Sequence, residues 1–92
     1  MRIAVVALGK IGLPLAVQFA RSGHDVVGVD VNSRLVASVN GGVEPFPGES
    51  GLQEALVDLV RTGRLRATTS YAEAIPGADA VVLVAPVFVD DV

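Results

Sequence analysis

The 92 residues include 10 acidic and 7 basic side chains, which give a net charge of −3, and 51% of the residues are hydrophobic. This size suits one small domain with a core of Val, Ala and Leu, and the few, scattered basic residues exclude nucleic acid and an anionic membrane surface as expected partners. With no cysteine and one histidine, the sequence predicts no disulfide, no cysteine nucleophile and no metal site.

The first element is an apolar run, Arg2 to Ala7, which predicts a strand. The run breaks at Leu8 to Gly12 into a glycine-containing turn, and apolar residues then recur at helical spacing as far as Gly23. A second apolar strand, Val26 to Val29, is closed by Asp30, eighteen residues after the last glycine of the turn. The chain therefore opens as strand, helix and strand.

This spacing is typical of a dinucleotide-binding turn. Gly9 and Gly12 let a pyrophosphate approach the backbone at the start of the helix, where unpaired N–H groups and the positive end of the helix dipole attract it. Asp30 is placed to accept hydrogen bonds from the adenosine ribose, and its charge would repel a 2′-phosphate, so the pattern predicts NAD rather than NADP. The usual first glycine is Ala7, and alanine fits there only if its φ stays negative and its methyl finds room. We therefore expect a reduced cofactor affinity.

The rest of the chain continues to alternate between helical and extended patterns. After Asp30 we expect a helix that opens near Asn32 or Ser33 and ends at Asn40-Gly41-Gly42, and then a loop at Glu44–Glu49. The next expected elements are a helix with a capping box of Ser50 and Gln53 that ends at Gly63, and a strand at Arg64–Thr69. Ser70 with Glu73 then predicts a brief helix that Pro76-Gly77 ends, and Ala80–Val84 is expected to be a fully buried strand.

This alternation predicts an α/β fold, a partial Rossmann-like doubly wound parallel sheet of about four strands in the order 3-2-1-4 with flanking helices. A complete dinucleotide fold has two such halves, so residues 1–92 are interpreted as the first half plus the strand that begins the second. The last strand would carry an exposed apolar edge. We therefore expect a homodimer that forms through this edge or through a bare helix face.

Five segments follow one family pattern in order and spacing: Met1–Ala16, Gly23–Asp30, Asn40–Gly42, Pro47–Leu52 and Gly63–Thr69. Together they resemble the N-terminal domain of the UDP-glucose/GDP-mannose dehydrogenase family. The resemblance implies an NAD-dependent oxidoreductase that oxidises the C6 alcohol of a UDP-hexose or UDP-N-acetylhexosamine to a carboxylate, as UDP-N-acetyl-mannosamine dehydrogenase does in polysaccharide biosynthesis. In such enzymes the catalytic cysteine and the sugar-nucleotide contacts lie in later domains, so this chain alone is expected to catalyse nothing.

The resemblance carries over only contacts to NAD, and it carries over no catalytic residue. The expected cofactor contacts are Gly9, Gly12, the backbone of Lys10 and Ile11, and Asp30. Arg34 stands one place before the family's basic residue, so it either steers the cofactor's phosphates or only occupies the start of a helix. The family's Pro-Thr-Pro segment reads Pro86-Val87-Phe88, which lacks a hydroxyl near the cofactor.

Other interpretations remain open at this point. The chain could be a stand-alone dinucleotide-responsive module that recruits another protein, the NAD domain of a hydroxyacid or hydroxyacyl dehydrogenase, or another βαβ protein in which the turn is only structural. The first strand begins at residue 2, which leaves no room for a signal peptide, and no apolar stretch approaches the ~20 residues that span a bilayer. A cytoplasmic protein is therefore expected.

Overall fold

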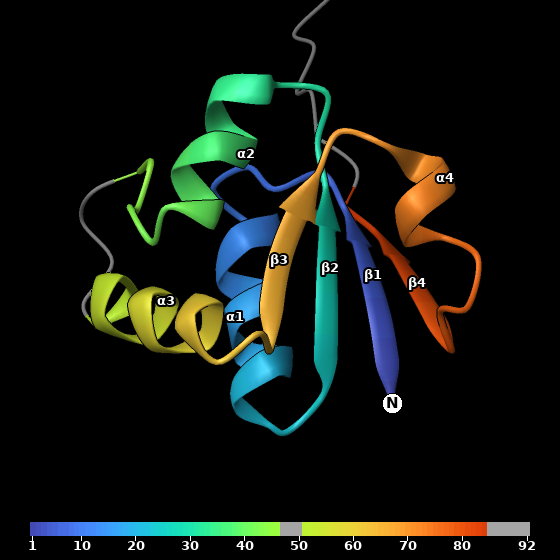
Figure 1. The fold of residues 1–92 in the computed structure, drawn as a ribbon, viewed down its shortest axis with the longest axis horizontal. Helices are drawn as coiled ribbons and strands as arrows, with labels where there is room; N and C mark the ends of the chain where they lie inside the picture. Colours follow the sequence, from blue (N-terminus) through green and yellow to red (C-terminus); the bar gives the residue numbers. More distant parts are fainter. Residues whose placement is uncertain (47–50, 85–92) are drawn as a thin grey trace, which may run out of the picture.

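The computed structural model describes residues 1–46 and 51–84, and every helix and strand that the sequence predicts is present (Figure 1). In chain order the elements are β1 (Arg2–Val6), α1 (Gly12–Arg21), β2 (Asp25–Val29), α2 (Ser33–Asn40), α3 (Leu52–Arg61), β3 (Leu65–Thr68), α4 (Tyr71–Ala74) and β4 (Ala80–Leu83). No helix in the described ranges is long and apolar enough to cross a membrane.

The four strands form one parallel sheet in the order β3-β2-β1-β4 (Figure 1). Ile3 of β1 pairs with Val26 of β2 on one side and with Ala80 of β4 on the other. Val26 pairs in turn with Leu65 of β3. The predicted α/β fold and strand order are therefore confirmed, and all four strands end at the same edge of the sheet, beside the glycine-containing turn.

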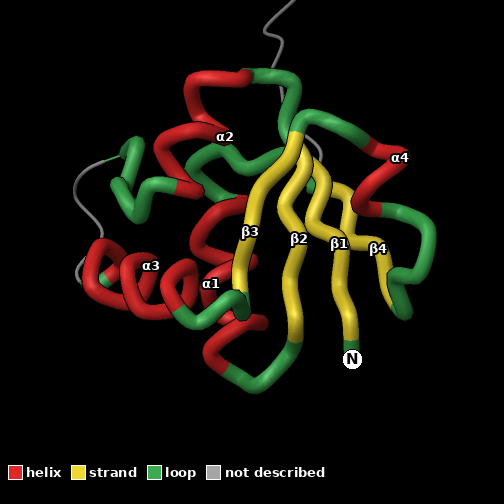
Figure 2. The backbone as a smooth tube through the Cα atoms, in the orientation of Figure 1, coloured by secondary structure: helices red, strands yellow, loops and turns green. Residues whose placement is uncertain are grey.

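Helices cover the two faces of the sheet unequally. Helices α1, α2 and α3 lie on one face and the short α4 lies on the other (Figure 2). Strand residues alternate between the two sides: Ile3 and Val5 join the main core beneath the three helices, whereas Ala4 joins a smaller cluster with Ala74 of α4. The deep core therefore lies on one side of the sheet, and the other side is thinly covered.

Strand β4 is half exposed, so the prediction of a fully buried strand is wrong. Ala80 and Val82 face the main core, but Val81 is 44% exposed and Leu83 is 74% exposed on the opposite face. The physical reason is position: β4 lies at the edge of the sheet, while α4 packs on β2 and β3. An unbroken apolar sequence predicted burial on both faces, but only one face of β4 has a helix over it.

The N-terminal caps of α2, α3 and α4 agree with the predicted caps to different extents. Asn32 caps α2 through its side chain, and Ser70 caps α4 by accepting the N–H of Glu73. The other half of the predicted capping box is wrong, because the Glu73 carboxylate accepts from Thr68 Oγ1 and the Ser70 N–H donates to Thr68 Oγ1. Helix α3 instead starts after Gly51, whose φ is +80°, and Ser50 lies outside the described residues. The Gln53 side-chain amide binds the loop before the helix, accepting from Glu44 N and donating to Gly42 O at 2.6 Å each. Its predicted capping box with Ser50 involves a residue outside the described ranges.

Candidate functional site

The glycine-containing turn lies between the end of β1 and the start of α1, where it borders a hollow of about 300 Å³. Asp30, directly after β2, faces the same hollow, because neighbouring parallel strands end at the same edge of the sheet. The residues that line it are Ala7, Gly9, Lys10, Ile11, Gly12, Asp30 and Val84. Five of the six residues that the sequence predicts for cofactor contact therefore come together in one place.

The start of α1 offers a row of free hydrogen-bond donors to this hollow. Among the described residues, the backbone N–H groups from Gly9 to Gly12 have no protein acceptor, and the first bond of the helix runs from Leu13 N to Gly9 O at 3.0 Å. No side chain caps this helix start, and its first turn carries no acidic residue. Unpaired N–H groups at the positive end of a ten-residue helix form a site that favours an anion.

Glycine suits the two positions of the turn for different reasons. A Cβ on Gly12 would lie 1.8 Å from the carbonyl oxygen of Ala7, so Gly12 is required for α1 to pack against the end of β1. A Cβ on Gly9 would meet no atom of the described residues within 4 Å. The space over Gly9 is open, as the approach of a pyrophosphate to the backbone requires.

Alanine at position 7 was expected to fit only with a negative φ, and the φ of Ala7 is positive. Its φ is +79°, and it is the one residue other than glycine with a positive φ in the described part of the chain. A left-handed backbone brings an alanine Cβ close to the following carbonyl and costs about 1–2 kcal/mol. The turn therefore keeps the backbone conformation that suits a glycine while it carries an alanine, and Ala7 is strained.

Asp30 is held by hydrogen bonds from two backbone N–H groups, one in the turn after β1 and one before α2. Its Oδ2 accepts the N–H of Leu8 at 2.9 Å, and its Oδ1 accepts the N–H of Asn32 at 2.9 Å. Its own N–H donates to the carbonyl of Thr68 in β3 at 3.1 Å. The carboxylate thus has a fixed orientation and retains lone pairs for further donors.

Arg34 does not join the other predicted residues. It lies exposed in the first turn of α2, where its backbone N–H donates to the Asn32 side chain at 3.0 Å, and it does not line the hollow. The segment Pro86-Val87-Phe88 lies outside the described residues. Arg34 therefore lies where one of its two interpretations put it, at the start of a helix, and not among the residues of the hollow.

The sequence did not predict that Leu8 and Gly28 fix the position of the turn. Leu8 is fully buried, and its side chain occupies the space beside Gly28, where a Cβ would come within 2.5 Å of the leucine methyl groups. A glycine inside an apolar strand was the available signal, because it indicates a close approach by another part of the chain. Leu8 thus enters the core from within the turn and ties it to β2.

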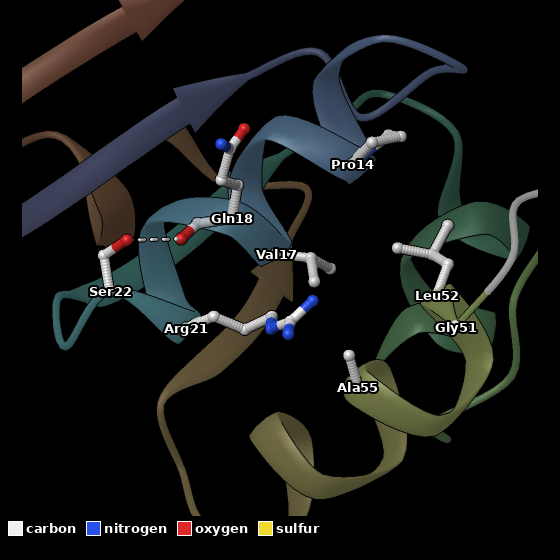
Figure 3. Close-up of a pocket in the computed structure, with 8 residues that line it drawn as sticks. All are labelled: Pro14, Val17, Gln18, Arg21, Ser22, Gly51, Leu52 and Ala55. Carbon is white, nitrogen blue, oxygen red and sulfur yellow. Dashed lines mark hydrogen bonds between the residues drawn. The ribbon is translucent and has the colours of Figure 1, made fainter.

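A second hollow, of about 500 Å³, lies between α1 and α3 (Figure 3). Pro14 and Val17 of α1 face Leu52 and Ala55 of α3 across it, and the guanidinium of Arg21 extends into the gap (Figure 3). None of the predicted cofactor residues line this hollow, and it lies away from the edge where the strands end. The free amides and Asp30 belong to the first hollow, which is therefore the candidate site.

Known proteins share both the sequence and the fold of this chain. The chain is 44% identical over 79 residues to GDP-mannose 6-dehydrogenase from Pseudomonas savastanoi pv. phaseolicola, an alignment that covers 86% of this chain and 18% of the relative. It is 44% identical over 86 residues to UDP-glucose 6-dehydrogenase from Haloferax volcanii, with 94% and 19% covered. The chain thus spans about a fifth of the length of these relatives.

Solved structures agree with these relatives. A ternary complex of GDP-mannose dehydrogenase from Pseudomonas aeruginosa matches with a TM-score of 0.92 at 33% identity, over 99% of this chain and 21% of that one. UDP-D-ManNAc dehydrogenase from Pyrococcus horikoshii matches with a TM-score of 0.84 at 38% identity, over 91% and 20%. Residues 1–88 match the model of the UDP-glucose/GDP-mannose dehydrogenase family, NAD binding domain. The chain belongs to this family, within its NAD-binding domain.

Proposed function

We propose that this chain binds NAD as the cofactor-binding part of a nucleotide-sugar 6-dehydrogenase. The observation that carries the proposal is the open space over Gly9, bordered by the free amides of the α1 N-terminus and by the carboxylate of Asp30. A pyrophosphate needs a bare backbone and several N–H donors, and the adenosine ribose needs an acceptor at the next strand end. These requirements meet in a single hollow that the described residues leave open.

In this proposal the pyrophosphate of NAD lies against Gly9 to Gly12. The backbone N–H groups of Lys10 and Ile11 donate to its oxygens, while Gly12 keeps the helix close to the end of β1. The fixed carboxylate of Asp30 accepts from the ribose hydroxyls and repels a 2′-phosphate, which favours NAD over NADP. Arg34 has a phosphate-steering role only if its side chain reaches round the start of α2.

Bound NAD would supply a hydride acceptor for alcohol oxidation. The relatives carry the names GDP-mannose 6-dehydrogenase, UDP-glucose 6-dehydrogenase and UDP-N-acetyl-D-mannosamine dehydrogenase. We therefore propose the C6 alcohol of a nucleotide-linked hexose as the substrate of the longer protein, with the sugar-nucleotide contacts and the catalytic residues supplied by its other parts. The proposed location is the cytoplasm, where NAD and nucleotide sugars are available.

A calorimetric titration with NAD, with NADP as the control ligand, tests the cofactor site. We expect saturable binding of NAD and at least about tenfold weaker binding of NADP, because the carboxylate of Asp30 faces the 2′ position. Equal binding of the two ligands would contradict the role of Asp30. If a chain shown to be folded binds neither ligand, the proposed cofactor site is refuted.

Gly9→Ala gives the sharper test, because a Cβ at this position lies more than 4 Å from every atom of the described residues, and the φ of Gly9 lies outside the left-handed region. The variant should therefore fold with an unchanged Tm, while its methyl group fills the proposed pyrophosphate position and weakens NAD binding about tenfold or more. Gly12→Ala is the matched contrast, since its methyl group would clash with Ala7 O and should destabilise the fold itself. If Gly9→Ala binds NAD like the unmodified chain, the pyrophosphate lies elsewhere.

A further inference from the structure

The carboxylate of Asp30 is already engaged by the protein before any ligand is considered. Oδ2 accepts from Leu8 N, which belongs to the phosphate-binding turn, and Oδ1 accepts from Asn32 N, which precedes α2. One side chain therefore joins the end of β2 to the turn after β1. A residue that only contacted a ribose would need neither bond.

The turn needs such a support, because it contains a strained residue. Ala7 has a φ of +79°, and its neighbour Leu8 is fully buried against Gly28. Strained backbone persists only where surrounding contacts fix it. The contacts that fix this turn are the Ala7 N–H donating to Val29 O at 2.7 Å, the buried Leu8 side chain, and the bond from Leu8 N to Asp30.

We propose that Asp30 is a positioning residue of the phosphate-binding turn: it holds Leu8 N so that the free amides from Gly9 to Gly12 face the hollow in the absence of ligand. This proposal rests on the proposed function, since it concerns the same cofactor site. Asp30 then has two roles, one toward the ribose and one toward the pyrophosphate, and the second acts through the backbone. The bonds involved are charge-assisted, and these are the stronger class of hydrogen bond.

Inorganic pyrophosphate separates the two roles, because it has the phosphate groups of NAD and no ribose. Asp30→Asn removes a negative charge from the hollow, so electrostatics alone predict tighter binding of this anion. The amide, however, has one oxygen to offer two backbone N–H donors, and its NH₂ group must face one of them. If Asp30 positions the turn, the variant binds pyrophosphate more weakly despite the favourable change in charge.

Asp25→Asn is the matched control. Asp25 begins the same strand, is exposed, and has a 3.4 Å ion pair with Arg64, so the control makes the same chemical change away from the turn. We expect Asp30→Asn to weaken pyrophosphate binding about tenfold and to speed amide exchange at Leu8 about tenfold or more, both measured by NMR without NAD. We expect Asp25→Asn to leave both unchanged. Unchanged or tighter pyrophosphate binding by a folded Asp30→Asn variant overturns the proposal.

If Asp30→Asn does not fold, a measurement on the unmodified chain tests the positioning role of Asp30. The Leu8 N–H···Oδ2 bond should give a scalar coupling between the Leu8 amide nitrogen and Asp30 Cγ, and the Leu8 amide should exchange slowly although it lies in a loop. Absence of the coupling, or fast exchange of the Leu8 amide, overturns the proposal. These readouts need no cofactor, so a chain that lacks NAD binding but keeps the coupling refutes the proposed function alone. Loss of the coupling in a chain that binds NAD refutes only the positioning role.

Discussion

At the scale of single residues, Ala7 is where sequence and backbone disagree. The glycine spacing predicted the turn and the place of Asp30, because each depends on a requirement that can be read from residue type. It did not predict that Ala7 adopts a φ of +79°. That angle results from contacts distant in sequence, namely Leu8 buried beside Gly28 and Ala7 N bonded to Val29 O. Ala7 adopts a positive φ because these contacts outweigh the preference of alanine for a negative φ.

Ala7→Gly should therefore stabilise the chain, which is the reverse of the usual effect of an alanine-to-glycine change. Glycine removes about 1–2 kcal/mol of left-handed strain and adds about 0.5–1 kcal/mol of unfolded-state entropy. The free energy of unfolding should rise by about 0.5–1 kcal/mol and Tm by about 2–8 °C, measured by thermal denaturation. The variant should also bind NAD more tightly, because a methyl group is removed from the lining of the hollow.

Ala37→Gly is the control for this prediction. Ala37 is exposed in the middle of α2, where glycine should lower the free energy of unfolding by about 1 kcal/mol. The two substitutions make the same chemical change and are expected to have opposite signs. A loss of stability in both variants would show that Ala7 is not strained.

At the scale of elements, the periodic patterns predicted every helix and strand, but they did not predict the contacts between residues distant in sequence. The spacing of Gln53 predicted a capping box, and no local pattern indicated that its amide binds the loop at Gly42 and Glu44. Asn40 was identified only as the end of a helix. In the structure it also binds the exposed edge of β3: its Nδ2 donates to Ala67 O and its Oδ1 accepts from Ala67 N, each at 2.8 Å. This side chain takes the place of a neighbouring strand.

Asn40→Ala should consequently loosen the β3 edge. The substitution removes both hydrogen bonds to Ala67 and should lower the free energy of unfolding by about 1–2 kcal/mol, measured by urea denaturation. Gln18→Ala provides the comparison, because Gln18 is an exposed helical amide whose side chain forms no hydrogen bond among the described residues, and its effect should stay within about 0.5 kcal/mol. Equal effects of the two changes would mean that the Asn40 bonds contribute no net stability.

At the scale of the whole molecule, alternation of helices and strands was enough to predict the sheet order, because parallel strands need crossovers and few arrangements satisfy them. The site follows from that order, since β1 and β2 end side by side and bring the turn to Asp30. What the sequence did not predict is which surfaces stay open. Burial of β4 depends on where α4 packs, and α4 lies over β2 and β3. The sheet therefore ends in a strand with apolar side chains on a face that no described helix covers.

This exposed strand predicts self-association of the chain. Val81 and Leu83 are 44% and 74% exposed on β4, whose outer edge has no neighbouring strand in the described sheet. We expect light scattering to detect a concentration-dependent dimer, and Leu83→Lys to weaken it at least about tenfold, because a buried ammonium without a partner is costly. Val43→Lys introduces the same charge at a 56% exposed valine away from β4 and should leave the dimer intact. A monomer at high concentration, or equal loss in both variants, would contradict association through β4.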